Sequence, residues 1–359
     1  MANLNLTKAK KAKNDEFYTQ WVDIEREVQA YLEFDPNVFA GKTILCPCDD
    51  PFESNFFKYF AVNFKEFKLK KLIATCYTGS PIANTQLSLF DYEEENNKTT
   101  RTPHKIEITD IDDIDKNADF DLRNVRWLLA NKQNALVRLE GDGDFRSAEI
   151  TKLRDEADMI ITNPPFSLFR EFVTWITEAQ KQFLIIGNLN AITYKEIFPL
   201  IKGNKMWLGP SISSGDRVFN VPDDYPLEAA GCGYDENGKP FIKVKGVRWF
   251  TNLDHGRRHE PLLTMTMADN LRYSRHKEVR GKEKYDSYDN YDAIDVPFTS
   301  AIPSDYNGAM GVPISFLDKY CPEQFEIIKF RKGNDEKDLS INGKCPYFRI
   351  LIRRRGITE

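Results

Sequence analysis

Short apolar runs alternate with helical patterns in the first half of the chain, and this alternation limits the possible folds more than any other feature. Each run is long enough for a buried strand, and each helical pattern follows such a run. The alternation predicts an α/β fold with a mostly parallel sheet that helices cover on both faces. The expected strands are residues 43–46, 71–76, 159–162 and 183–186, and the expected helices are residues 54–64 and 168–177.

The polar turns that follow two of these strands are the first candidates for a site. In open α/β sheets, ligands bind beyond the carboxyl ends of the strands, where the strand order reverses. The strands that end at Cys46 and Thr162 both run directly into polar turns. We therefore expect these two turns to form one site.

Two stretches depart from the alternating pattern. Residues 78–140 form a polar excursion that is too long for a simple connection. From about residue 205, Gly, Pro, Tyr and Asp become frequent and the alternation is less clear. The sequence predicts a first domain at residues 1–204, which includes the excursion, and a second, irregular α+β region at residues 205–359.

The turn after the third strand has the sequence Asn163-Pro164-Pro165-Phe166. Two successive prolines fix the backbone in a stiff, extended conformation just past the strand. Such a backbone holds a carbonyl oxygen in place without reorganisation. The Asn163 side-chain oxygen and the Pro164 carbonyl are placed to accept both hydrogens of one exocyclic amine. The alternative is a plain strand–turn–helix junction with a buried Phe.

Two acceptors matter because the exocyclic amine of adenine is a poor nucleophile, with its lone pair delocalised into the ring. They would favour rehybridisation and stabilise the positive charge that develops as nitrogen attacks a methyl group. Phe166 would offer a flat face on which an extruded base can stack. No strong general base is needed, since the proton can leave after the transfer.

Three other segments are candidates for cofactor contacts. The turn Cys48-Asp49-Asp50 ends the first strand with two carboxylates, although the usual glycine-rich fingerprint is absent. A carboxylate there could pair with an ammonium group, or it could simply favour the start of the next helix. Asp144 and Phe145 lie in a tight Gly/Asp loop that is equally consistent with a surface turn. The third candidate is Phe17-Tyr18-Thr19, which could otherwise be a helix start.

Together these segments resemble the adenine-specific DNA methyltransferases of the EcoRI type, almost from end to end. The resemblance rests on residues 15–20, 48–51, 54–60, 141–147, 162–170, 193–196, 305–308, 330–333 and 338–344. It implies a class I methyltransferase fold, a Rossmann-like, mostly parallel seven-stranded sheet with one antiparallel edge strand. It also implies S-adenosylmethionine as the methyl donor and a flipped-out adenine in double-stranded DNA as the target. The catalytic role then falls to Asn163–Phe166, and the three cofactor segments are those named above.

The resemblance places target recognition in the second half of the chain. Residues 210–280 match the family pattern poorly, so the recognition sequence need not be the family's GAATTC. Arg and Asn side chains can read purine edges, although each is also consistent with a surface residue or a phosphate contact. The candidates are Arg217, Arg248, Asn252, Arg257 and Arg258, together with the basic cluster that includes Arg272, Arg275 and Lys277.

Charge and composition narrow the remaining possibilities. The net charge of −5 argues mildly against a nucleic-acid partner, but local clusters matter more than the total. No apolar run reaches the roughly 20 residues that span a bilayer, and the Lys-rich start lacks a secretory signal. The six cysteines lack a regular spacing, which is typical of reduced cytosolic thiols without a metal. We therefore expect a cytoplasmic protein, and we favour a monomer because methylation of one strand per visit needs no partner.

Within the excursion, Gln86–Phe90 resembles the short peptide by which bacterial proteins bind the replication sliding clamp. Such a peptide needs a flexible tether and apolar anchors. The alternative, which we favour, is a local helix that packs onto its own domain.

Other classes remain possible at the level of sequence. An RNA adenine methyltransferase fits the catalytic turn equally well, and an inactive DNA-binding protein could keep the same fold. Protein glutamine methyltransferases normally end the turn in Tyr, and cytosine-N4 enzymes usually have Ser where Asn163 stands.

Overall fold

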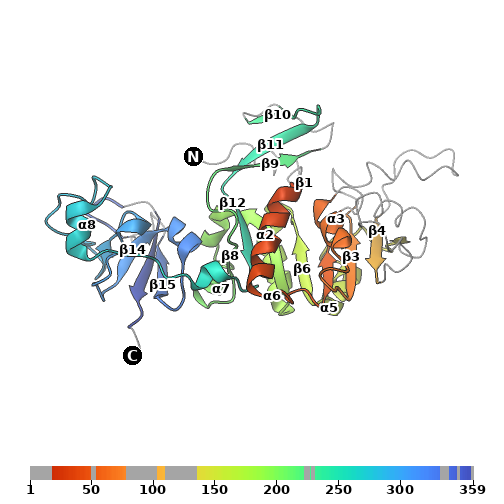
Figure 1. Ribbon diagram of the computed structural model, residues 1–359, viewed down its shortest axis with the longest axis horizontal. Helices are drawn as coiled ribbons and strands as arrows, with labels where there is room; N and C mark the ends of the chain where they lie inside the picture. The colour runs from red at the N-terminus through yellow and green to blue at the C-terminus, as the bar shows by residue number, and fades with distance from the viewer. Residues whose placement is uncertain are drawn as a thin grey trace. The chain divides into compact units, whose positions relative to one another are not determined.

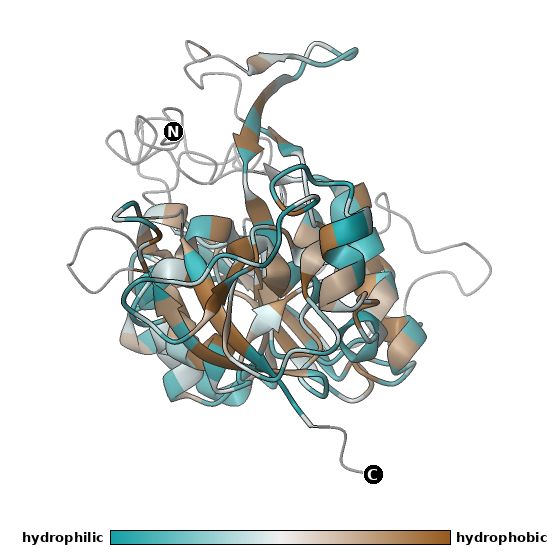
Figure 2. Cartoon of the chain, turned by 90° about the vertical axis from the view of Figure 1, so that its left-hand side faces the viewer, coloured by the Kyte–Doolittle hydropathy of each residue, from teal (hydrophilic) through white to brown (hydrophobic). Residues whose placement is uncertain are grey.

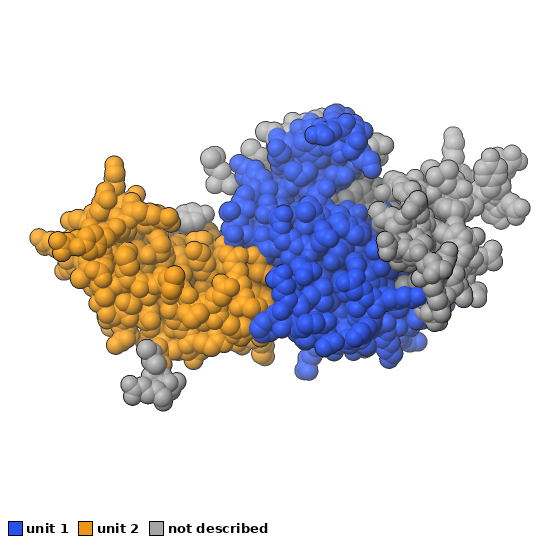
Figure 3. Space-filling view, viewed as in Figure 1, with its two compact units in different colours: residues 1–191, 211–253 blue, residues 192–210, 254–359 orange. Residues whose placement is uncertain are grey.

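The computed structural model describes residues 18–49, 54–77, 103–109, 136–221, 227, 231–331, 339–345 and 348–356. The chain divides into two compact units, shown in different colours in Figure 3. The first comprises residues 1–191 and 211–253, and the second comprises residues 192–210 and 254–359. Residues 211–253 thus belong to the first unit, whereas the sequence led us to expect a boundary after residue 204.

A large mixed sheet forms the centre of the first unit (Figure 1). Its strands are β2 (Thr43–Cys46), β3 (Lys71–Thr75), β4 (His104–Ile108), β5 (Leu136–Arg138), β6 (Met159–Thr162), β7 (Gln182–Asn188) and β12 (Val247–Thr251). Within this unit they follow the order β5-β4-β3-β2-β6-β7-β12. All four strands expected from the sequence are present, and they pair in parallel as β3-β2-β6-β7.

The sheet contains more antiparallel pairing than we expected. β12 runs antiparallel to β7, β4 antiparallel to β3, and β5 antiparallel to β4. The expectation of one antiparallel edge strand was therefore too simple. Whether two strands pair in parallel or antiparallel depends on how the chain connects them, and a local apolar pattern contains no information about that connection.

Helices cover both faces of this sheet. α2 (Trp21–Phe34) and α3 (Asn55–Val62) lie on the near face in Figure 1, where they share one core cluster with alternate residues of the strands, such as Ile44 and Ile161. α6 (Phe169–Glu178) packs on the opposite face, with Phe169 against Phe250. α5 (Ala148–Glu156) begins at Ser147, whose hydroxyl caps the helix. The two helices expected from the sequence are confirmed as α3 and α6.

A small antiparallel sheet projects from the first unit (Figure 1). Its strands follow the order β1 (Tyr18–Thr19), β9 (Asp216–Asn220), β11 (Pro240–Lys245) and β10 (Cys232–Tyr234). Phe219, Ile242 and Val244 on these strands are buried in the same core cluster as α2 and α3. This pairing explains why residues 211–253 fold with the first unit.

The second unit has its own antiparallel core. Its sheet follows the order β13 (Ile294–Asp295), β14 (Met310–Pro313), β16 (Arg349–Arg354) and β15 (Phe325–Arg331), with only the β13–β14 pair parallel. The remaining elements are α7 (Phe198–Lys202), β8 (Trp207–Leu208), η5 (Gly256–His259), α8 (Met267–Tyr273), η6 (Thr299–Ala301) and η7 (Ile314–Lys319), and η4 (Leu189–Thr193) spans the boundary. Figure 2 faces this unit and shows apolar strands among more hydrophilic helices and loops.

In the described part of the chain, no helix has the length and hydropathy needed to span a membrane. The same residues contain no group of three or more His, Cys, Asp or Glu side chains that could hold a metal ion.

Candidate active site and nucleic-acid contacts

The turn Asn163–Phe166 lies where the sequence predicted it, at the carboxyl end of β6. Asn163 is only 6% exposed, and the two prolines after it are also buried. The Pro165 carbonyl accepts a hydrogen bond from the Leu168 amide at 3.0 Å, which starts the short 3₁₀ helix η3 (Phe166–Leu168) that leads into α6. The stiff turn between strand and helix is therefore confirmed.

Phe166 is 5% exposed and belongs to the core cluster that includes the buried residues of α2 and α3. Most of its ring is therefore already in contact with other side chains. Stacking of an extruded base on this ring stays a prediction.

Asp49 connects the turn after β2 to the predicted catalytic turn at Asn163–Phe166. Its carboxylate is buried and accepts hydrogen bonds from the Ser54 hydroxyl at 2.5 Å and from the Thr162 hydroxyl. Its backbone amide donates to the Thr75 carbonyl at the end of β3, at 3.2 Å. Thr162 immediately precedes Asn163, so the predicted cofactor turn and the predicted catalytic turn are in direct contact.

The N-terminal candidate segment meets the same region through α3. The Asn55 side chain at the start of α3 donates to the carbonyl of Thr19 at 2.7 Å, and Thr19 itself is buried. Cys48 is half-buried in the turn after β2. Phe17, Asp50 and the side chain of Tyr18 lie outside the described residues.

The Gly/Asp loop reaches the end of β3 with its backbone. Gly143 has φ +80°, and a Cβ atom added to it would lie 2.0 Å from the Cys76 carbonyl oxygen. Asp144 is paired with Arg146 at 2.6 Å, and Arg146 also contacts Glu171 at 2.9 Å. The hydrogen bond from Arg146 is the main cause that holds the pKa of Asp144 below its usual value.

Phe145 of this loop is buried against α6. Its ring contacts Phe172 and Trp175 edge-on, at centroid distances of 5.0 and 5.5 Å. Asp144 and Phe145 thus hold the loop on α6 in this structure, and any contact they make with a cofactor would come in addition to these partners.

The ends of β2, β3 and β6 therefore bring the predicted segments together at one edge of the sheet. This edge is also the switch point, since β3 lies on one side of β2 and β6 on the other. Ser54, Asn55 and Thr162 also belong to this network, although the sequence did not predict a role for them. The Ser-Asn pair ahead of an apolar helix was a visible N-cap signal, but nothing local links Thr162 to Asp49, 113 positions away.

Three of the predicted base-reading residues have structural partners. Arg248 is buried in β12 and donates to the carbonyls of Val247 and Ser213 at 2.9 and 2.6 Å. Asn252 accepts from the Phe183 amide at 2.8 Å and donates to the Lys181 carbonyl at 3.0 Å. These bonds join neighbouring segments of the first unit, so both side chains have a structural role here in place of the base contacts predicted from the sequence.

Arg258 is buried in the second unit. It donates to Asp254 at 3.1 Å and to Asn204, and its guanidinium stacks over the Trp207 ring. Its guanidinium is therefore held within its own unit, contrary to the base contact predicted from the sequence. Arg217 is half-buried beside Asp23, with 3.8 Å between Nε and a carboxylate oxygen, which leaves it less free for DNA than the sequence suggested.

The basic cluster around α8 is open to solvent. Arg272, Arg275 and Lys277 are all exposed. Arg272 lies over the ring of Tyr273, which is itself 61% exposed. An exposed aromatic ring among cations is a combination that binds nucleic acids well.

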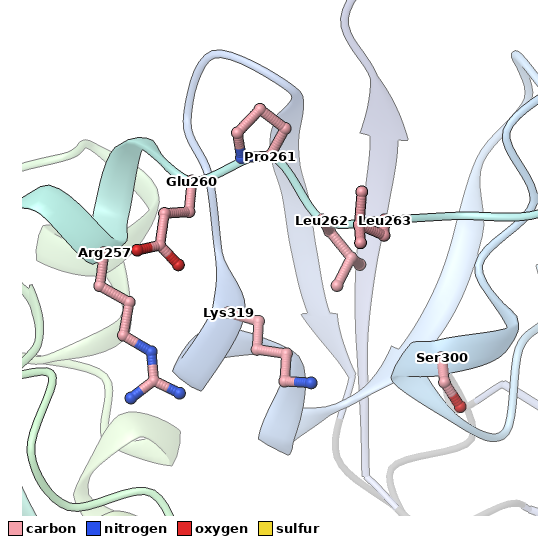
Figure 4. Close-up of a pocket in the computed structure, with 7 residues that line it drawn as sticks. All are labelled: Arg257, Glu260, Pro261, Leu262, Leu263, Ser300 and Lys319. Carbon is pink, nitrogen blue, oxygen red and sulfur yellow. The ribbon is translucent and has the colours of Figure 1, made fainter.

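A pocket is also present on the second unit (Figure 4). Arg257 and Lys319 extend toward it from two different elements, and Leu262 and Leu263 form part of its wall. Arg257 also donates to the Pro210 carbonyl at 2.6 Å, so one of its nitrogens is already used. The clamp-like segment Gln86–Phe90 lies outside the described residues.

Comparison with known proteins gives a consistent result over the whole chain. Residues 5–355 match the family model described as "Adenine-specific methyltransferase EcoRI". The Type II methyltransferase M.EcoRI of Escherichia coli is 47% identical over 364 residues, covering 99% of this chain and 98% of that protein.

Two mycoplasma proteins are also similar. The Type II methyltransferase M.MgeORF184P of Mycoplasma genitalium is 34% identical, over 98% of this chain and 99% of its own. M.MpnI of Mycoplasma pneumoniae is 33% identical, over 97% of each chain. No solved structure gives a significant match.

Proposed function

Since the chain belongs to the EcoRI family of adenine-specific methyltransferases and is a type II DNA methyltransferase, we propose that it transfers the methyl group of S-adenosylmethionine to N6 of a flipped-out adenine. The observation that carries this proposal is the buried Asn163-Pro164-Pro165 turn at the switch point of the sheet. The predicted cofactor segments reach the same edge, which supports a common site for donor and target.

The residues at this edge suit a donor with a charged amino-acid end and an adenosine end. Bound there, S-adenosylmethionine would supply an electrophilic methyl group. The turn after β2, with Cys48 and Asp50, and the segment Phe17–Thr19 would hold it from one side, and the loop at Asp144 from the other. This arrangement follows the rule that ligands of open α/β sheets bind at the carboxyl ends of the strands.

The chain's own groups would act on the target amine. Asn163 Oδ1 and the Pro164 carbonyl would each accept one N–H of the adenine, which favours rehybridisation of the nitrogen and localises its lone pair for attack on the methyl group. Both acceptors are held by the rigid turn, so they need no reorganisation as positive charge develops on nitrogen. Burial of the turn strengthens these interactions because the site excludes water.

The duplex must be bound as well, and the exposed basic cluster is our candidate for phosphate contacts. Arg272, Arg275 and Lys277 are the residues proposed from the sequence that the structure leaves accessible. The pocket in Figure 4 has two further cations, Arg257 and Lys319, but it also contains the Glu260 carboxylate, so the α8 cluster is the better candidate.

The test is to sequence plasmid DNA from cells that express this chain, with a method that detects modified bases, beside an Asn163→Ala control. We expect N6-methyladenine at one short motif in the wild type only. In vitro, Asn163→Ala should leave donor binding within about threefold of wild type and lower turnover by at least a hundredfold, since the acceptor acts mainly in the transition state. Unmodified DNA from soluble wild-type protein, or near-normal turnover in the variant, would contradict the proposal.

A further inference from the structure

Asp49 is a buried carboxylate that accepts hydrogen bonds from two hydroxyl groups of the protein. The Ser54 hydroxyl donates to one oxygen at 2.5 Å, and the Thr162 hydroxyl donates to the other. Its side chain is 5% exposed, and Thr162 is fully buried. A buried carboxylate is costly unless it accepts hydrogen bonds, so these two contacts fix where it lies.

Thr162 is the last residue of β6 and is joined by one peptide bond to Asn163. Threonine is β-branched, so a hydrogen bond from its hydroxyl locks the side chain and restrains the local backbone. The backbone of the turn after β2 is also held by hydrogen bonds to β3. The Asp49 amide donates to the Thr75 carbonyl, and the Thr75 hydroxyl donates to the Pro47 carbonyl at 3.2 Å.

We propose that Asp49 is a positioning residue, which acts through Thr162 to set the orientation of the Asn163–Pro164 acceptors, rather than a direct ligand of the methyl donor. The proposal rests on the function proposed above for the Asn163 turn. It reassigns Asp49 from the cofactor to the catalytic geometry. It also means that the turn after β2 and the turn after β6 move as one body.

Thr162 would thus affect catalysis although its hydroxyl takes no part in the chemistry. A misplacement of about 1 Å at a reacting group can cost about a hundredfold in rate. Without the Thr162 hydroxyl, the turn would lose its hydrogen bond to Asp49 in the turn after β2. The donor would still bind, since its own contacts are unchanged.

The test measures single-turnover methyl transfer with radiolabelled S-adenosylmethionine, and donor binding by calorimetry, on the full chain. We expect Thr162→Val to lower the transfer rate tenfold to a hundredfold, with the donor Kd within about threefold of wild type. Thr162→Ser keeps the hydroxyl and should restore the rate to within about threefold. Thr251→Val is the matched control, because it removes another fully buried hydroxyl of the same sheet, one that donates to the Phe183 carbonyl at 2.7 Å.

A double variant separates positioning from mere stability. If Thr162 acts through Asn163, adding Thr162→Val to Asn163→Ala should lower the residual rate by less than threefold. If the two substitutions instead lower the rate independently, so that the double variant shows the product of the two single losses, the inference is overturned. A normal rate in Thr162→Val would overturn it as well. Neither result would affect the role of Asn163. An Asp49→Asn variant that binds the donor more than tenfold more weakly, yet turns over normally at saturation, would overturn the inference too. A normal rate in Asn163→Ala would instead refute the proposed function.

Discussion

His255 illustrates how a single buried side chain makes stability depend on pH. It is 4% exposed, and its Nε2 lies 3.2 Å from the Leu208 carbonyl oxygen, so this nitrogen donates and carries the proton of the neutral ring. Burial is the main cause that lowers the pKa of His255 to about 4, and the hydrogen bond to Leu208 offsets part of the effect. The folded second unit therefore takes up the extra proton only well below pH 6.5.

We predict that the second unit loses stability as the pH falls from 6.5 toward 4. In this window the unfolded chain binds a proton at His255 that the folded chain does not, so protonation favours unfolding. The loss should reach about 2 kcal/mol by pH 5. Urea denaturation at pH 7.5 and 5 measures it, and a His255→Asn variant should show a smaller difference between the two. An equal difference in both proteins would assign the effect to other groups.

Residue type predicted the stiff turn after Asn163 but did not reveal that two of the candidate arginines are buried. Two prolines after Asn163 dictate a stiff turn in almost any context, so that motif could be read locally. Arg248 and Arg258 were chosen because arginine suits DNA, yet each is buried with acceptors of its own unit. Burial is a property of the assembled fold, and no local pattern distinguishes a buried arginine from an exposed one.

At the level of elements, the loop between β5 and α5 depends on one glycine. Gly143 combines φ +80° with a very close approach to the Cys76 carbonyl at the end of β3. Only glycine satisfies both conditions, because a Cβ would overlap the carbonyl oxygen. This contact is what brings the loop to the edge where the donor is proposed to bind.

We predict that Gly143→Ala weakens donor binding at least tenfold, because the loop must move away from β3. Gly238→Ala is the matched control, since Gly238 has φ +74° but nothing within 4 Å of the added Cβ. Both variants lose about 1 kcal/mol of stability because alanine is strained at positive φ. Only Gly143→Ala also places a Cβ atom against the Cys76 carbonyl oxygen. Calorimetric titration with S-adenosylmethionine compares them. Equal affinities in the two variants would show that this loop does not shape the donor site.

Some strands can be predicted from a local apolar run, and others cannot. β2, β3, β6 and β7 are continuous apolar runs, and the sequence located all four. β12 was missed because Arg248 interrupts its apolar run, although all five of its residues are buried. β9 and β11 were missed because the stretch around them is rich in Gly and Asp, and their role appears only when β9 pairs with β1 and with β11.

At the scale of the whole molecule, the net charge of −5 hides a local concentration of positive charge. The exposed cations at α8 belong to the second unit, whereas the proposed chemistry belongs to the first. Long-range attraction of DNA depends on such local clusters rather than on the total. The sequence predicted that chemistry and DNA contacts belong to different parts of the chain. It could not predict the boundaries of the two units, because the first unit is made of two separate segments.

We predict that replacing Arg272, Arg275 and Lys277 together by Ala reduces DNA affinity and its dependence on salt. Each lost phosphate contact lowers the slope of log K against log[salt] by about 0.9, so the slope should fall by about 2 to 3. Donor binding should not change. The control replaces three exposed lysines of the first unit, Lys65, Lys70 and Lys152. An unchanged slope in the α8 variant would exclude this cluster from the DNA interface.

The discontinuous first unit also has a consequence for synthesis of the protein. β7 emerges from the ribosome well before β12, its antiparallel partner, and residues 192–210 of the other unit come in between. Until β12 appears, one side of β7 is an open strand edge, which readily pairs with other chains. The nascent chain therefore has a vulnerable interval that ends only when the strand carrying Arg248 docks, and a chain interrupted in that interval should aggregate rather than act as a partial enzyme.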